Sequence, residues 1–158
     1  MKPGKDPGAS AVSYAVKLLS YRDRSEAEIR QRLAQRGFPE EILDTALGRL
    51  RDAGLVDDRR FAEALVRHAT GVRRTGRRGI RAALHKRGLA RELVEEALSR
   101  VVEDPSAAAG LIIKRMQGMS GLPAETVRRR LWSLLSRRGF SPETIREALK
   151  LSGVKEEG

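Results

Sequence analysis

The 158-residue chain contains no cysteine, which excludes disulfide frameworks, thiol catalysis and zinc held by thiolates. It has only two histidines, so a metal site is not expected. Its six aromatic residues are scattered and do not form a base-stacking platform. No apolar run approaches the roughly 18 residues of a membrane span, and no apolar stretch follows the charged N-terminus as it would in a secretory signal. We therefore expect a cytoplasmic protein that has no membrane partner.

Motifs typical of enzymes are also missing. The segment from Gly71 to Gly76 has half of a phosphate-binding loop, but it lacks the Lys-Ser/Thr pair that reaches the terminal phosphate and magnesium. Asp57 and Asp58 form a carboxylate pair, yet their place directly before an expected helix favours capping over acid–base or metal chemistry. No nucleophile–base pair is evident. The sequence therefore predicts a protein that is not an enzyme and has no catalytic residue, cofactor or metal.

What the chain does contain is an internal repeat. The pattern Leu-x-x-Arg-Gly-(Phe/Leu) occurs at 33–38, 84–89 and 135–140, with an offset of 51 residues each time. A fixed period indicates an array of related units. Apolar residues recur at helical spacing and no alternating strand pattern is present. We expect an all-α fold of three tandem three-helix repeats, 11–57, 58–103 and 104–151, in an elongated, curved array. A flexible N-terminal segment, 1–10, and a C-terminal tail, 152–158, flank the repeats.

The ends of the expected helices carry their own signals. Glycine follows the Arg of each repeated block, where a left-handed residue closes a helix and the next apolar residue packs back on it. Ser25 and Glu28 have the spacing of a capping box. The residues to which we assign structural roles are Gly37, Gly88, Gly139, Ser25, Asp57 and Asp58.

Positive charge is concentrated in the middle repeat. The chain has a net charge of +11, and 25 of its 32 basic residues are arginine. Residues 59–91 contain 11 basic side chains and one acidic one, Glu63. A second basic focus follows at 128–130 and 137–138. Since balancing carboxylates are nearly absent from 59–91, an anionic partner is favoured over a merely solvated helix face.

Helical geometry selects the arginines that face such a partner. Arg77 and Arg81 share one helix face, opposite Ile80 and Leu84. The residues just before this helix lie near its positive dipole end, where phosphate is favoured. The candidate contacts to DNA or to an acidic protein surface are Arg73, Arg74, Arg77, Arg78, Arg81, Arg129, Arg130 and Arg137. Weaker candidates, for which helix-end stabilisation or core packing is an alternative, are Lys86, Arg87, Arg128, Arg138 and Trp132.

Four segments resemble one family when taken in order. They are Tyr21–Leu33, Ala53–Ala62, Gly79–Leu89 and the Leu-x-x-Arg-Gly-Phe-Ser-Pro-Glu-Thr-Ile block that ends at Ile145. From about residue 11 to 149 the chain resembles the bacterial regulatory protein RecX family. The resemblance implies tandem three-helix repeats that bind the recombinase RecA, enter the groove of its filament on DNA and usually inhibit strand exchange and filament growth. One departure concerns the middle repeat, where the family often has Pro beside a Gly. This chain has Gly76-Arg77-Arg78-Gly79 instead, and we expect that segment to be more basic and more mobile.

The combined hypothesis is a regulatory protein that binds the RecA filament on DNA and modulates, most often inhibits, its recombinase and ATPase activity in recombination, repair and the SOS response. The expected partners are the RecA filament and the backbone of single- or double-stranded DNA, and the chain is expected to be monomeric. The alternative is a stand-alone, sequence-nonspecific nucleic-acid-binding helical protein. An enzyme is disfavoured by the missing catalytic constellations.

Overall fold

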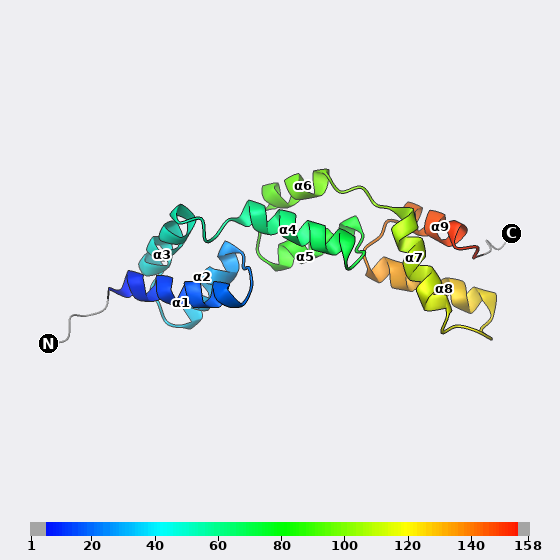
Figure 1. Ribbon diagram of the computed structural model, residues 1–158, viewed down its shortest axis with the longest axis horizontal. Coiled ribbons are helices and arrows are strands. Elements are labelled where there is room, and N and C mark those ends of the chain that lie inside the picture. The colour runs from blue at the N-terminus through cyan, green and yellow to red at the C-terminus, as the bar shows by residue number, and fades with distance from the viewer. Residues whose placement is uncertain (1–5, 155–158) are drawn as a thin grey trace. The chain divides into compact units, whose positions relative to one another are not determined.

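A computed structural model describes residues 6–154, and over this range the chain forms nine α-helices and no strand, which confirms the all-α prediction (Figure 1). The first repeat contains α1 (Pro7–Tyr21), α2 (Glu26–Gln35) and α3 (Glu40–Asp52). The second contains α4 (Asp58–Gly71), α5 (Arg77–Lys86) and α6 (Arg91–Ser99). The third contains α7 (Pro105–Met116), α8 (Ala124–Arg137) and α9 (Pro142–Leu151).

The described chain divides into two compact units. Unit 1 comprises the residues up to Ala64 together with Leu84–Val94. Unit 2 comprises Leu65–Ala83 together with the residues from Glu95 onward. The basic residues that precede and open α5, and those on α8, therefore belong to the same unit.

Each unit has its own apolar core. In unit 1, Ala11 and Ala15 of α1 are buried with Ile29 and Leu33 of α2 and with Leu47 of α3. Alanine at the α1 positions allows close packing, and α1 and α3 make extensive contact. The core of unit 2 combines α7, α8 and α9, with α7 packed mainly on α9; its large buried side chains are Ile112, Leu131, Leu135, Phe140, Ile145 and Leu149.

The helix C-termini close as the repeated block predicts. Gly37, Gly88 and Gly139 have φ of +91°, +76° and +82°. After Gly37, the amide of Phe38 donates to the carbonyl of Leu33 at 3.2 Å, and the equivalent bonds from residues 89 and 140 reach Leu84 and Leu135. This is the 6→1 hydrogen bond of a Schellman motif.

The N-terminal caps agree in part with the expectations. Ser25 and Glu28 form the capping box of α2. The Asp57 carboxylate caps its own helix, accepting from the Arg60 amide at 3.0 Å. Asp58 has a different role, because its carboxylate accepts from the Glu26 amide at 2.8 Å and so caps α2 of the preceding repeat. The sequence expectation that Asp58 caps the helix it begins is therefore wrong.

The first helix begins earlier than residue 11. Asp6 accepts from the Gly8 amide at 3.0 Å and Pro7 occupies the first turn, so α1 begins at Pro7. Residues 7–10 of the segment expected to be flexible are thus helical. Residues 1–5 of that segment, and 155–158 of the expected tail, lie outside the described residues.

Candidate basic interface

A tight turn joins α4 to α5 and carries the first candidate arginines. The Val72 amide donates to the His68 carbonyl at 3.0 Å, and the Thr75 amide donates to the Ala69 carbonyl at 2.8 Å. Arg73 and Arg74 are exposed in this turn. Arg74 has φ of +48°, a left-handed conformation that is unfavourable for a residue with a Cβ.

Two glycines then bring the start of α5 against the loop between α8 and α9. The Gly76 amide donates to the Arg138 carbonyl at 2.9 Å. A Cβ on Gly76 would lie 2.3 Å from the Phe140 nitrogen, and one on Gly79 would lie 2.6 Å from the Arg138 carbonyl oxygen. Only glycine permits this approach. The Gly76–Gly79 segment is thus held by main-chain bonds and close packing.

The positive end of α5 is occupied by a carboxylate of the protein. Glu103 accepts from the Arg77 amide at 2.8 Å and from the Ser141 amide and hydroxyl at 3.0 and 2.8 Å, so it caps both α5 and α9. Partial burial raises the pKa of Glu103, but hydrogen bonds from Thr144, Ser141 and the Arg77 amide outweigh it and hold the pKa below 4.5. From the sequence we expected this helix end to favour a phosphate of the partner, but the Glu103 carboxylate occupies the position.

Beside this carboxylate lies an open groove, which we call the arginine groove. It has a volume of about 640 Å³, and the residues that line it include Arg77, Arg78 and Arg81. Val102 also lines the groove and is 86% exposed. Arg81 is ion-paired with Glu95 at 3.1 Å, whereas the exposed side chains of Arg77 and Arg78 have no ion-pair partner among residues 6–154. The groove therefore offers unneutralised guanidinium groups next to an exposed apolar side chain.

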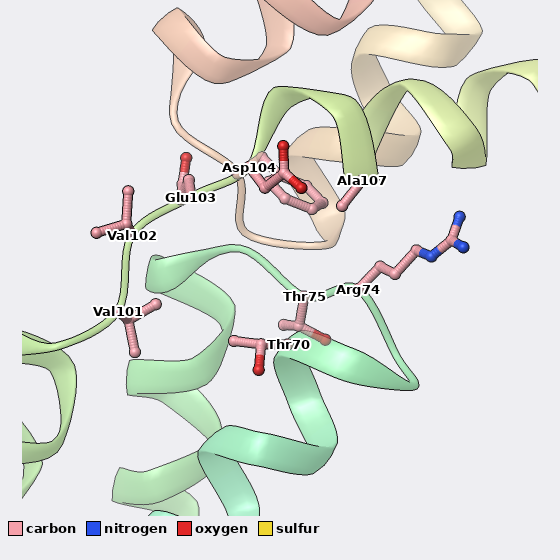
Figure 2. Close-up of a pocket in the computed structure, with 9 residues that line it drawn as sticks. Thr70, Arg74, Thr75, Val101, Val102, Glu103, Asp104 and Ala107 are labelled. Atoms are coloured by element: carbon pink, nitrogen blue, oxygen red, sulfur yellow. The ribbon is translucent and has the colours of Figure 1, made fainter.

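A smaller cavity of about 50 Å³ lies between the α4–α5 turn and the segment that precedes α7. Figure 2 shows Glu103 and Asp104 at this cavity and the Arg74 side chain directed away from both carboxylates. Arg74 therefore does not neutralise them, and its charge remains available to solvent.

The candidates on α8 lie outside the arginine groove. Arg129, Arg130 and Arg137 are exposed, on the side of α8 opposite the buried Leu131 and Leu135. Trp132 packs against the core of unit 2. Arg128 is half-buried.

Two of the weaker candidates make contacts inside the protein. Arg87 pairs with Glu28 at 2.9 Å, and its guanidinium lies 5.9 Å from the ring centre of Phe61. Arg138 donates to the Arg73 carbonyl and so secures the α4–α5 turn. Lys86 is exposed and belongs, like Arg87, to unit 1. For Arg87 and Arg138 the geometry favours the structural alternative.

Sequence reasoning missed Glu103, Val102 and the close approach of Gly76 and Gly79. The 51-residue period gives no signal for Glu103, because it pairs Asp58 with residue 109, which is alanine. Residues 26 and 77 are equivalent, and each amide is capped by a carboxylate from further along the chain, Asp58 in one case and Glu103 in the other. The exposed Val102 had no signal, because a single valine between helices is indistinguishable from a core residue.

The described residues contain neither a metal-binding cluster nor a helix suited to cross a membrane. In the described part of the chain, no group of three or more His, Cys, Asp or Glu residues is placed to hold a metal ion. None of the helices in residues 6–154 combines the length and apolar composition that crossing a membrane requires. This part of the chain is an all-helical repeat protein with an arginine-rich surface.

The family follows from comparison with known proteins. Models of the first, second and third three-helix domains of RecX match residues 11–50, 57–98 and 103–149. The chain belongs to the RecX family, whose members are named regulatory proteins rather than enzymes.

Individual relatives match along most of their length. Regulatory protein RecX of Thermobifida fusca (strain YX) is 32% identical over 96% of this chain and 85% of its own. That of Prosthecochloris aestuarii (strain DSM 271 / SK 413) is 33% identical over 88% of this chain and 91% of its own. The crystal structure of RecX from Lactobacillus salivarius has a TM-score of 0.82 at 22% identity, over 95% of this chain and 99% of its own. A second crystal structure, of a regulatory protein RecX, has a TM-score of 0.81 at 25% identity, over 95% of this chain and 74% of its own.

Proposed function

We propose that this protein binds the RecA recombinase filament on DNA and inhibits its ATPase and strand-exchange activity. The observation that carries the proposal is the arginine groove, in which Arg77 and Arg78 stand exposed without an ion-pair partner among residues 6–154. Unneutralised guanidinium groups at a fixed helix end favour binding of phosphate or carboxylate oxygens. Family membership supports the recombinase as the partner.

The mechanism is one of binding. The α5 N-terminus is fixed on the α8–α9 loop by the Gly76 and Arg78 amides, which donate to the carbonyls of Arg138 and Gly139. The arginines at this end are therefore presented on a rigid support, which lowers the entropy lost on binding. The exposed Val102 adds apolar contact next to the charges. When this surface is bound to the filament, the protein hinders the addition and rearrangement of recombinase subunits.

The direct test measures ATP hydrolysis by RecA on single-stranded DNA at increasing concentrations of this protein. We expect hydrolysis to fall as the protein is added, and to fall at concentrations well below those that saturate free DNA. Unchanged hydrolysis at concentrations that saturate the DNA would contradict the proposal.

The alternative, a stand-alone nucleic-acid-binding protein, is favoured only by the uncompensated charge of residues 59–91. A pull-down separates the two functions, because retention on recombinase filaments above about 0.2 M salt requires protein contacts, whereas phosphate contacts alone weaken steeply with salt. In the proposed role the protein acts as a monomer in the cytoplasm, which sedimentation and cell fractionation test.

A further inference from the structure

Three arginines of unit 1 lie around a single carboxylate. Arg22 and Arg87 both donate to Oε1 of Glu28, at 3.0 and 2.9 Å. Glu28 also accepts from the Ser25 amide at 3.0 Å, and its side chain is only 18% exposed. Arg22, Glu28 and Arg87 all act electrostatically on the third arginine, Arg24. Because two guanidinium groups already bind Glu28, this carboxylate does not form an ion pair with Arg24.

Arg24 is therefore held in the cluster as an uncompensated charge. It is half-buried, and its Nε donates to the Leu18 carbonyl at 3.4 Å, near the C-terminal end of α1. Its Nη groups have no hydrogen-bond or ion-pair partner among residues 6–154. Burial lowers the pKa of the Arg24 guanidinium, and the charge of Arg22 lowers it further. The fold thus disfavours the charge that Arg24 carries at neutral pH, and a residue that lowers stability in this way is typical of a binding site.

An exposed tyrosine directly precedes the cluster. Tyr21 is the last residue of α1, it is 74% exposed, and Arg22 follows it in the chain. Tyrosine and arginine are enriched among the residues that supply most of the binding energy of protein–protein interfaces. The ring offers a large apolar area, and the guanidinium offers paired hydrogen-bond donors. This composition is that of a protein-contact surface.

The surroundings of Arg24 suit a single carboxylate better than a polyanion. Asp23, directly before Arg24, is exposed. The Asp58 carboxylate lies at the N-terminus of α2, where it accepts from the Glu26 amide at 2.8 Å. Residues 1–57 contain 10 basic and 9 acidic side chains, so this part of the chain has no extended positive field. Successive phosphates of DNA would be repelled by these carboxylates, whereas one carboxylate side chain of a protein needs only the free guanidinium.

We propose that Arg24 and Tyr21 form a second contact surface, in unit 1, which binds a carboxylate side chain of the protein partner. The inference rests on the proposed function, in which that partner is the recombinase. The Nη groups of Arg24 donate to the carboxylate oxygens, and the Tyr21 ring adds apolar contact beside them. Arg22 and Arg87 stay on Glu28 and so leave the Arg24 charge for the partner.

The test compares binding to RecA filaments with binding to free DNA. Arg24→Gln removes the charge, and Arg24→Lys keeps a charge without the paired donors. Tyr21→Ser removes the ring. The control, Arg91→Gln, removes one exposed charge from α6 in the same unit. Binding to preformed RecA filaments is measured by co-sedimentation, and binding to free duplex and single-stranded DNA by fluorescence anisotropy. Thermal unfolding of each variant is followed in parallel.

We expect Arg24→Gln to weaken filament binding about tenfold, as loss of a charge-assisted contact does. Arg24→Lys and Tyr21→Ser should weaken it by at least about threefold. The loss should persist at about 0.2 M salt, because salt screens a partly buried charge pair less than an exposed one. All three variants should bind free DNA, and the control should bind both targets, within about twofold of wild type. Arg24→Gln should melt at or above the wild-type temperature, because repulsion from Arg22 is relieved.

Three results would overturn this contact while leaving the proposed function intact. The first is wild-type filament binding by Arg24→Gln. The second is a loss of binding that follows a lower melting temperature, which would make Arg24 a structural residue. The third is equal weakening on filaments and on free DNA, in which case the anion is a phosphate and the protein carboxylate is wrong. Wild-type protein that neither binds the filament nor affects RecA would instead refute the proposed function and this contact together.

Discussion

Gly37 and Gly88 close equivalent helices, yet their surroundings differ. Both have positive φ, and a Cβ at Gly37 would meet nothing within 4 Å. A Cβ at Gly88 would lie 2.6 Å from the Ala27 Cβ. The two positions therefore separate the conformational cost of a left-handed residue from the cost of steric overlap.

We expect Gly37→Val to destabilise the protein by about 1–2 kcal/mol, the cost of a side chain in the left-handed region. Gly88→Val should cost about 1–3 kcal/mol more, because the valine also overlaps the Ala27 side chain. Urea unfolding at neutral pH measures both free energies. Equal costs would show that the contact between residue 88 and α2 relaxes without penalty.

The arginine groove allows a second test at the level of single side chains. Arg77→Glu with Arg78→Glu reverses two exposed charges and keeps the main-chain bonds of both residues. We expect inhibition of RecA ATPase to be lost, because two charge-assisted contacts of about 1.5–3 kcal/mol each disappear. The free energy of unfolding should change by no more than about 0.5 kcal/mol, as at other exposed sites.

The control for this variant must avoid Arg81, whose partner is Glu95. Reversing Glu95 would break an ion pair at the edge of the groove and is unsuitable. Lys17→Glu with Arg32→Glu makes the same change of charge on exposed residues of unit 1 and should retain inhibition. If the variant with Arg77→Glu and Arg78→Glu still inhibits RecA, the two arginines are exposed to solvent and do not contact the partner.

At the scale of the helices, equivalent positions of two repeats donate hydrogen bonds to equivalent carbonyl groups. Ser25 donates to the Arg87 carbonyl, and the equivalent residue 76 donates through its amide to the Arg138 carbonyl. Asp58 and Glu103 cap α2 and α5 in the same way. Asp58 connects α2 to the next repeat, and Glu103 connects α5 to the start of α9 through Ser141, so protonation acts on the connection between repeats.

Lowering the pH should therefore reduce the free energy of unfolding, because it protonates Glu28 and Glu103. Burial raises the pKa of Glu28, but bonds from Arg22, Ser25 and Arg87 bring it below 4.5, as for Glu103. An acid whose folded pKa is lowered contributes stability above its unfolded pKa and loses it as the pH falls through the folded value. Burial raises the pKa of Asp58 above 3.8, so that its contribution has the opposite sign and offsets part of the loss.

We expect Glu103→Gln to cost about 1–3 kcal/mol at pH 7, the effect of weakening several hydrogen bonds to a carboxylate. It should also reduce the loss of stability between about pH 5 and pH 3, because one of the titrating groups is gone. Thermal unfolding across this range measures both effects. Glu147→Gln, exposed on α9, is the control. An acid dependence identical to that of the wild type would show that Glu103 does not link stability to pH.

How far the sequence predicts these features depends on how local each one is. The glycine C-caps and the Ser25 capping box are predictable because their geometry involves residues within five positions of one another. The Arg81–Glu95 pair and the Arg138 bond to Arg73 join residues 14 and 65 positions apart. No periodicity encodes such contacts. The left-handed Arg74 is unpredictable for the same reason, since distant groups impose it.

At the scale of the whole molecule, the net positive charge determines how the protein binds a polyanion. The net charge is +11, and the strongest candidate residues lie in unit 2. Guanidinium contacts to phosphate position a protein on DNA but carry no sequence information. Affinity should then depend on salt far more than on sequence.

We expect binding to free duplex DNA to have a log–log salt slope of roughly −5, because about six phosphate contacts contribute about 0.9 each. Affinities for unrelated duplexes of equal length should agree within about threefold, since no base contact is involved. Fluorescence anisotropy on two duplexes of different sequence, titrated over a range of salt, measures both quantities. A slope near −1, or strong preference for one duplex, would contradict a basic surface that recognises only the backbone. A steep salt slope for DNA binding, together with filament inhibition that persists at higher salt, would indicate two kinds of contact. The arginines would bind DNA, and a second, less salt-sensitive surface would bind the recombinase.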